Sequence, residues 1–223
     1  MTGSGDSTLL GRALADAFAP DSPADEVTTR LLDAAYDQFC RMGIRRSTME
    51  DVARRAGVSR ITAYRRFATK DALVEQVVRR EFRRYFDQFL IDISSARTAA
   101  DRVVVGFASS LRAFRNNPLI GGLMTAEPDL LVPSLINDGG QTMAVVQRFV
   151  AARLRVDQQD GHISPSVDVD LVAEVWTRLS ASFLAIPSQL VDLDDDTQLQ
   201  DIARRFLAPM LTPTNTAMPT APS

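Results

Sequence analysis

Arginine and small hydrogen-bonding side chains are concentrated in the stretch from residue 60 to residue 70, which reads RITAYRRFATK. An arginine guanidinium can donate two parallel hydrogen bonds to O6 and N7 of a guanine, and this stretch holds Arg60, Arg65 and Arg66. The methyl groups of Ile61 and Thr62 can contact the methyl group of a thymine. These side chains therefore have the chemistry to prefer particular DNA sequences.

Residues suited to catalysis are sparse and scattered. The chain has one cysteine, Cys40, and one histidine, His162, so no set of Cys and His residues can hold a structural zinc ion. A hydrolase that uses Glu127, Asp129 and His162 is conceivable, but no motif places a nucleophile beside a general base. We therefore expect no enzyme, no metal site and no cofactor, and we expect Cys40 to be a small core residue.

Charge is distributed unevenly along the chain. The formal net charge of −3 argues, taken alone, weakly against a nucleic-acid partner. The segment from Glu26 to Phe86 nevertheless holds 14 of the 25 Lys and Arg residues, against 8 of the 28 Asp and Glu residues. A basic module is therefore joined to an acidic body, and a clustered basic region favours nucleic-acid binding.

Two short helices joined by a tight turn must position these side chains. Thr48 can cap the first helix, and Ser59 can cap the second helix, which begins at the next residue. Gly57 stands between them, where a tight turn requires a positive φ. Ala53 is small enough for a second helix to approach closely, and Val58 can fill the angle between the helices. This order of residues is typical of a helix-turn-helix.

The same residues resemble the signature of the TetR family of transcriptional regulators. The resemblance rests on the run GVSRITAYRRF from Gly57 to Phe67, followed by KDAL at residues 70–73. It covers residues 26 to about 80, and it departs from the family at Ala63, where a bulkier apolar residue is more usual. The stretch from Asn117 to Pro133 also resembles actinobacterial members of the family.

The resemblance implies a role for each polar residue of the motif. Thr48, at a helix N-terminus, is expected to bind a phosphate through its hydroxyl and nearby amides. Tyr64 and Lys70 are expected to hold the DNA backbone on either side of the groove. We expect solvated helix faces for Arg54, Arg55, Arg79, Arg80, Arg83 and Arg84. The expected DNA-binding set is Thr48, Ser59, Arg60, Ile61, Thr62, Tyr64, Arg65, Arg66 and Lys70.

The spacing of apolar residues predicts an all-α fold. Nearly every segment carries such residues every three to four positions, and almost none alternates with period two. The first helix is expected to bury one stripe, made of Val27, Leu31, Ala35, Phe39 and Met42. Together with the two short helices of the motif, it should form a compact head.

The expected organisation has four parts. Residues 1–24 and 212–223 are rich in small, polar and proline residues, so we expect disorder at both ends. Residues 25–70 should form the helix-turn-helix DNA-binding domain, and residues 71–211 a helical effector-binding and dimerisation domain. A long helix from Lys70 to Ile93 should join the two domains.

The helices expected at residues 167–186 and 195–210 are apolar over a wide face. Their stripes are Val172, Trp176, Leu179, Phe183 and Ile186 in the first helix, which Leu171, Val175 and Ala185 widen, and Leu199, Ile202, Phe206 and Met210 in the second. The pair resembles the helices by which TetR-family members form homodimers through four-helix packing. An intrachain core is the alternative interpretation.

A further set of apolar side chains could line a cavity for a small apolar or amphipathic effector, as in the sensor domains of the family. The set is Phe107, Leu111, Phe114, Leu123, Met124, Met143, Phe149 and Trp176. Methionines suit an adaptable apolar pocket, although each of these residues could equally belong to an ordinary core.

The function expected from the motif and the resemblance is a ligand-responsive repressor that binds a palindromic operator in double-stranded DNA as a dimer. An activator, or a regulator without a small-molecule effector, is the alternative, and a helix-turn-helix protein that has lost DNA binding is a further rival. No segment has the roughly 18 uninterrupted apolar residues needed to cross a membrane, and the N-terminus does not read as a signal peptide. We therefore expect a cytoplasmic protein with no membrane partner.

Overall fold

The computed structural model describes residues 12–13, 16–17, 24–126, 141–186 and 188–213. Within these residues all regular structure is helical, so the expected all-α fold is confirmed. The chain divides into two compact units. The first contains Met1–Leu90 and Arg112–Val146, and the second contains Ile91–Leu111 and Gln147–Ser223.

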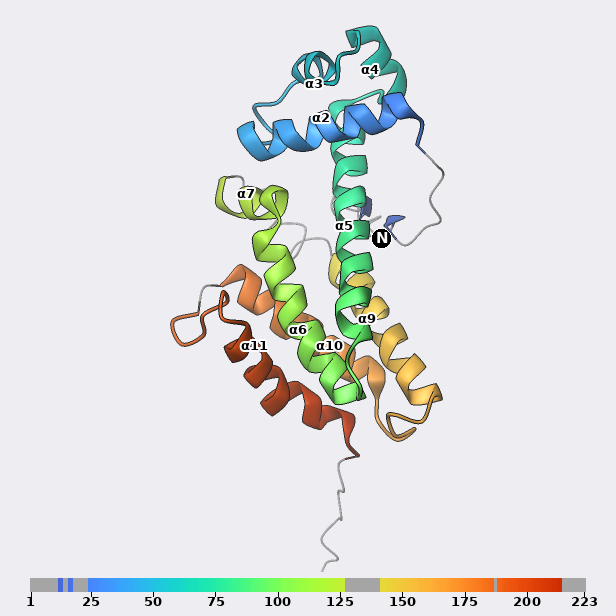
Figure 1. Cartoon of the computed structure of the whole chain (residues 1–223), viewed down its shortest axis with the longest axis vertical. Coiled ribbons are helices and arrows are strands. Elements are labelled where there is room, and N and C mark those ends of the chain that lie inside the picture. The colour runs from blue at the N-terminus through green and yellow to red at the C-terminus, as the bar shows by residue number, and fades with distance from the viewer. Residues whose placement is uncertain (1–11, 14–15, 18–23, 127–140, 187, 214–223) are drawn as a thin grey trace, which may run out of the picture. The chain divides into compact units, whose positions relative to one another are not determined.

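Three helices form the head of the first unit: α2 (Glu26–Met42), α3 (Met49–Ala56) and α4 (Arg60–Arg66) (Figure 1). Helix α2 packs against α3, and α3 packs against α4. The expected stripe of α2 is buried from Leu31 to Phe39, but Met42 is 50% exposed because α2 ends at this residue and no later turn covers it. Met42 is therefore not a core residue.

Helix α5 (Lys70–Ser94) is the long helix expected after the motif. Its inward stripe includes Leu73, Val77, Phe82 and Phe86, all of which are buried. Residues 70–90 group with the head, and the last turn belongs to the second unit. The expected domain boundary between residues 70 and 71 stays a prediction.

The described part of the N-terminal arm packs on α5. Ala13 and Ala17 are buried, and a helical hydrogen bond of 3.0 Å joins them. The Nε atoms of Arg79 and Arg83 donate to the backbone carbonyls of Asp16 and Ala17, at 3.1 and 3.2 Å. These residues make defined contacts because small side chains allow close packing and arginines bind the carbonyls at the end of the turn, whereas the disorder expected over residues 1–24 stays a prediction.

Helix α7 (Pro118–Ala126) begins at the cap that the Asn-Pro sequence predicts. Asn117 Oδ1 accepts hydrogen bonds from the amides of Leu119 and Ile120, both at 3.0 Å. Asn117 Nδ2 lies 3.3 Å from Glu81 Oε2, which ties the start of α7 to α5. The turns expected at Pro128 and Pro133 lie outside the described residues.

The second unit contains parts of α6 (Ala99–Asn116) and α9 (Gln141–Gln159), together with α10 (Val169–Ala185) and α11 (Asp196–Ile202). After α11 the chain continues through a π-helical turn, Ala203–Leu207, and a 3₁₀ turn, Ala208–Leu211. The start of α10 differs from the expected one, because Asp168 rather than Ser166 caps this helix.

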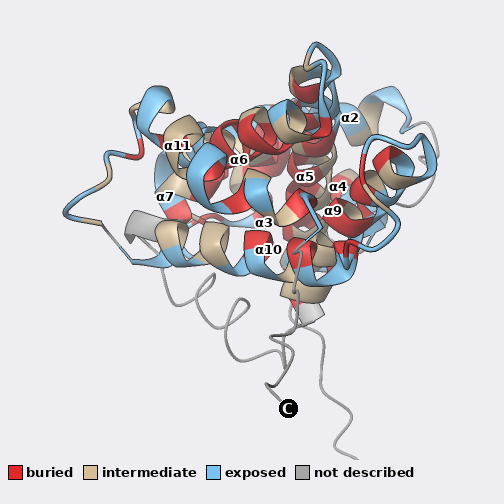
Figure 2. Cartoon of the chain, turned by 90° about the horizontal axis from the view of Figure 1, so that it is seen from below, coloured by how far each residue is buried: buried red, intermediate tan, exposed pale blue. Residues whose placement is uncertain are grey.

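The core of the second unit is held by an ion pair and by aromatic packing. The Arg102 guanidinium binds both carboxylate oxygens of Asp157, at 2.5 and 3.1 Å. The rings of Phe107 and Phe183 pack edge to face with their centres 6.2 Å apart. Figure 2 shows buried residues on one side of α10 and exposed residues on the other.

Candidate nucleic-acid interface

A capping box fixes the start of α3. Thr48 Oγ1 accepts a hydrogen bond of 3.1 Å from the Asp51 amide, and the Thr48 amide donates to the Asp51 carboxylate at 3.3 Å. The Thr48 hydroxyl also donates to this carboxylate at 2.6 Å. Hydrogen bonds from Thr48 and Arg54 lower the pKa of Asp51. The hydroxyl proton of Thr48 is therefore already used within the protein.

The turn between α3 and α4 has the geometry that the motif predicts. Gly57 adopts a left-handed conformation with φ 67°, which would cost a residue with a side chain about 1–2 kcal/mol. Ser59 Oγ then accepts a hydrogen bond of 3.1 Å from the Thr62 amide and caps α4. The sequence therefore determines both helix ends at this turn through glycine and a serine cap.

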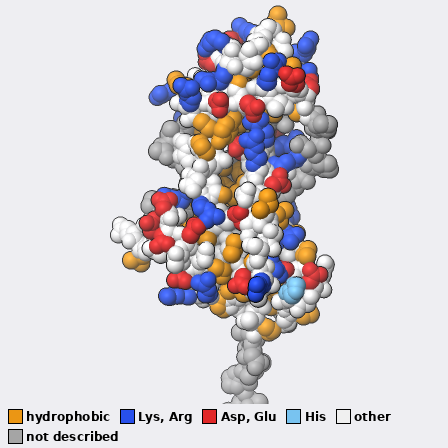
Figure 3. All heavy atoms as spheres, in the orientation of Figure 1, with side chains coloured by type: hydrophobic (Ala, Val, Ile, Leu, Met, Phe, Trp, Pro, Cys, Tyr) orange, Lys and Arg blue, Asp and Glu red, His pale blue; other side chains and the backbone are white. Residues whose placement is uncertain are grey.

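Helix α4 presents a largely polar, exposed face. Ile61 is 79% exposed and Thr62 is half-buried. Four neighbours are exposed: Arg60, Tyr64, Arg65 and Arg66. The opposite side is anchored by Ala63, which is completely buried. The smaller residue at this position thus lies fully inside the head. Figure 3 shows basic side chains along the outer edge of the head.

Arg60, the first residue of α4, is held between a carboxylate and an aromatic ring. Its Nε lies 2.7 Å from Glu50 Oε1 of α3. Its guanidinium carbon lies 5.3 Å from the centre of the Tyr64 ring, within the range of a cation–π contact. Sequence reasoning missed Glu50, which precedes the turn and carries no motif signal.

Arg66, the last residue of α4, forms an ion pair with Asp25. Asp25 also caps α2, because its carboxylate accepts a hydrogen bond of 2.8 Å from the Thr28 amide. Hydrogen bonding to Thr28 and, to a smaller extent, the Arg66 charge lower the pKa of Asp25. Among the described residues no carboxylate pairs with Arg65.

Lys70, the first residue of α5, binds the loop that precedes α3. Its Nζ donates to the carbonyl oxygens of Ile44 and Ser47 at 3.1 and 3.2 Å. The ammonium therefore holds this loop through two of its three protons.

The six arginines expected on solvated faces all have protein partners, but Arg54, Arg55 and Arg84 are exposed as expected, whereas Arg79, Arg80 and Arg83 are half-buried. In order from Arg54, Arg55, Arg79, Arg80, Arg83 to Arg84, the partners are Asp51, Gln38, the Asp16 carbonyl, Asp33, the Ala17 carbonyl and Glu81. Arg54 and Arg84 pair with a carboxylate one turn away on their own helix, and the long side chains of the other four reach neighbouring segments.

The residues expected to line an effector cavity fall into two groups. Phe107, Leu111, Phe149 and Trp176 belong to the second unit, whereas Phe114, Leu123 and Met143 belong to the first. Phe107 and Leu111 are fully buried, Leu123 and Trp176 are 5% exposed, and Phe114, Met143 and Phe149 are half-buried. The Met124 side chain lies outside the described residues. Phe183, which packs on Phe107, was missing from the expected set although it continues the stripe of Trp176.

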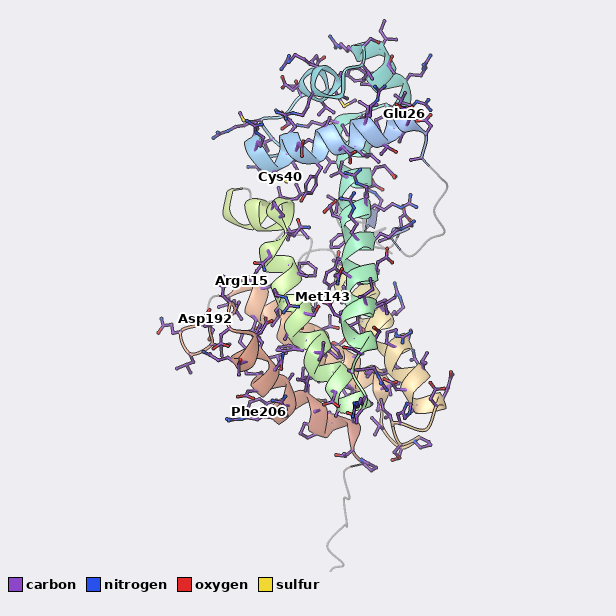
Figure 4. The ribbon with its side chains drawn as sticks, viewed as in Figure 1. Glu26, Cys40, Arg115, Met143, Asp192 and Phe206 are labelled. Atoms are coloured by element: carbon purple, nitrogen blue, oxygen red, sulfur yellow. The ribbon has the colours of Figure 1, made fainter. Side chains whose placement is uncertain are left out.

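The C-terminal helices have apolar residues on two different faces. Val172 and Trp176 of the expected stripe are buried within the second unit. Leu171 is 56% exposed and Val175 is 37% exposed, and Phe206 of the π-helical turn is 65% exposed (Figure 4). The exposed apolar face of α10 thus contains Leu171 and Val175, which the sequence analysis placed beside the main apolar stripe rather than in it.

Comparison with known proteins identifies the head. The family model described as bacterial regulatory proteins, tetR family, matches residues 31–77, which run from α2 through the turn into α5. The head belongs to the TetR family. Its relatives are named as DNA-binding transcriptional regulators rather than enzymes. Within the described part of the chain, no cluster of His, Cys, Asp and Glu could hold a metal ion, and no helix is long and apolar enough to span a membrane.

TetR-family relatives match most of the chain. The HTH-type transcriptional regulator Rv1255c of Mycobacterium tuberculosis is 28% identical over 188 residues, which cover 84% of this chain and 87% of the relative. The repressor KstR2 of Mycolicibacterium smegmatis is 27% identical over 158 residues, with coverages of 70% and 77%. The regulator FadR from Bacillus subtilis, solved in complex with stearoyl-CoA, shares the fold with a TM-score of 0.56, 16% identity and coverages of 82% and 97%.

Proposed function

We propose that this regulator is a ligand-responsive repressor that binds a palindromic operator as a homodimer and is released by a small apolar or amphipathic effector. The observation that carries the proposal is the exposed face of α4, where Arg60, Ile61, Arg65 and Arg66 project from a helix fixed at both ends. We propose that it acts in the cytoplasm, where bacterial DNA lies.

Helix α4 is suited to the major groove. It is seven residues long and is capped by Ser59, so its exposed N-terminal residues can approach base edges. Arg60, Arg65 and Arg66 can each bind guanine as a fork, and the exposed Ile61 can contact a thymine methyl. Thr62 completes this base-reading set.

Phosphate binding is assigned to residues around the turn. Tyr64 is partly exposed beside the base-reading face, and the N-terminus of α3 at Thr48 offers free amides to a phosphate. The Thr48 hydroxyl must release Asp51 to make the same contact. Lys70 has one proton left for a phosphate, and its other two hold the loop before α3.

A homodimer follows from the small size of the reading helix. One α4 helix contacts too few base pairs for specific affinity, so two heads are required on a two-fold symmetric site. The exposed apolar residues Leu171, Val175 and Phe206 supply a face that a second copy would cover. Each copy would contribute the same face to a four-helix contact.

An apolar or amphipathic effector is supported by the aromatic content of the body. The second unit brings together the rings of Phe107 and Phe183 and buries Trp176. The structural relative FadR was solved with stearoyl-CoA, and long-chain acyl compounds are therefore the first ligands to test. A regulator without an effector, or an activator, is the alternative.

Sequencing of the genomic fragments bound by the protein tests the proposed function. We expect an imperfect palindrome whose half-sites are about 34–36 Å apart or a multiple of this distance. Affinity should fall by about 0.9 log units per log unit of salt for each phosphate neutralised. Bound fragments without any shared sequence would contradict operator recognition.

A further inference from the structure

We propose that Glu50 is a specificity-determining residue of the DNA-binding surface, which competes with phosphate for Arg60 and leaves the two terminal nitrogens of Arg60 available to a guanine edge. This inference rests on the proposed reading of DNA by α4. Glu50 lies outside the expected contact set, and its carboxylate comes from α3 rather than from the reading helix.

The geometry places the Arg60 guanidinium in a defined position. Its Nε is 2.7 Å from Glu50 Oε1, and its carbon is 5.3 Å from the Tyr64 ring centre. The Arg60 side chain is 66% exposed and the Glu50 side chain 42% exposed. Such an exposed ion pair is weak, so an incoming DNA molecule can displace it.

The ion pair has different consequences on random and on matching DNA. On random DNA, Arg60 can gain a single charge contact with a phosphate, and it must give up the Glu50 carboxylate to do so. On a guanine edge, Nη1 and Nη2 of Arg60 can donate two parallel hydrogen bonds to neutral acceptors while Nε stays paired with Glu50 Oε1. Glu50 therefore weakens random binding more than specific binding, and specificity is the difference between the two affinities.

The opposite end of α4 repeats this arrangement with Asp25 and Arg66. Asp25 differs from Glu50 because it also caps α2. Asn caps a helix as well as Asp does, so Asp25→Asn removes the charge and keeps the cap. Arg65 has no carboxylate partner in the described structure, and its contribution should not depend on either acid.

The experiment compares wild type with Glu50→Gln in fluorescence-anisotropy titrations over a salt series. One probe is a duplex that the wild-type protein selects from a random library, and the other is a random-sequence duplex. Asp37→Asn is the matched control, because Asp37 is an exposed carboxylate of α2 for which the described residues offer no ion pair. Melting curves establish that each variant is folded.

We expect Glu50→Gln to bind the random duplex about three- to fivefold more tightly, and its affinity for the selected duplex to change by less. The slope of log affinity against log salt concentration should steepen by about 0.9 on the random duplex, because Arg60 becomes free to neutralise one more phosphate. Asp25→Asn should act in the same direction. Asp37→Asn should preserve the ratio of the two affinities.

The effect must also depend on Arg60. In an Arg60→Ala background, Glu50→Gln should lose its influence on the affinity ratio, as a double-mutant cycle measures directly. If Glu50→Gln leaves the affinity ratio and the salt slope unchanged while wild type still prefers its selected duplex, the inference is wrong and the proposed function stands. A wild-type protein with no preference for any duplex would contradict both.

Discussion

Lys70 Nζ lies 3.1 Å from the backbone carbonyl oxygen of Ile44, so the first residue of α5 is bonded to the loop between α2 and α3. A second bond of 3.2 Å to the Ser47 carbonyl fixes the same loop. The lysine expected to bind phosphate therefore also positions the cap of α3, which begins just after this loop.

Lys70→Ala should lower both stability and DNA affinity. Loss of two hydrogen bonds from a charged donor should decrease the free energy of unfolding by about 1–3 kcal/mol. The affinity for DNA should fall by about the same factor on every duplex. Urea denaturation measures the first effect. Arg65→Ala, at an exposed position, serves as the control and should leave stability unchanged while weakening DNA binding. Wild-type stability in Lys70→Ala would show that the two bonds contribute nothing to the head.

Leu171→Glu or Phe206→Glu should convert the proposed dimer into a monomer at micromolar concentration. Each change puts a charge on an apolar face that a second copy would bury, where an unpaired charge is costly. Sedimentation velocity measures the association. Leu190→Glu is the control, because Leu190 is 93% exposed in a loop outside the helices. A dimer that tolerates both changes at the C-terminal helices would place the interface elsewhere.

An effector that releases DNA should be bound less tightly when operator is present. A hundredfold preference for the DNA-free form corresponds to about 2.7 kcal/mol of coupling, and the reciprocal effect must have the same size. Fluorescence of Trp176, the only tryptophan, follows the titration of acyl compounds with and without the selected duplex. Equal affinities under both conditions would exclude release by that ligand, even if it binds.

Cys40, near the end of α2 (Figure 4), should react slowly with alkylating reagents. Burial raises the pKa of the Cys40 thiol above its ordinary value, and a hydrogen bond with Tyr36 opposes this shift. Because the thiolate is the reactive form, the pH at which alkylation reaches half its maximal rate should be higher for Cys40 than for a free thiol. Tyr36→Phe should raise this midpoint pH further. The protonated thiol stabilises the fold at neutral pH, and this contribution is lost as pH rises through the pKa of the folded state. A midpoint pH of alkylation equal to that of a free thiol would contradict this account.

The head could be predicted in detail because its signals are local. Thr48, Gly57 and Ser59 act on backbone within three residues of themselves, and each has the predicted conformation or hydrogen bond. The partners of Arg60 and Arg66 could not be predicted in this way. Their carboxylates come from other helices, and only the folded chain brings them together.

The body was less predictable for a different reason. The spacing of apolar residues correctly indicated helices, but it did not reveal which side of α10 the chain's own helices cover. Val172 and Trp176 lie in the core, whereas Leu171 remains exposed. Core residues and cavity-lining residues also have the same composition, so the sequence did not show whether Phe107 and Leu111 line a cavity or fill the core. In the structure both are fully buried.

Two copies of α4 are proposed to read a symmetric DNA site, and affinity measurements on Arg66→Ala test this reading most directly. Binding of wild type and variant would be measured on the selected duplex, on all its single-base variants and on random DNA. We predict a loss of about 1–3 kcal/mol on the selected duplex and a relaxed base preference at two positions related by the two-fold axis of the site. Equal losses on selected and random DNA, with every base preference retained, would contradict the claim.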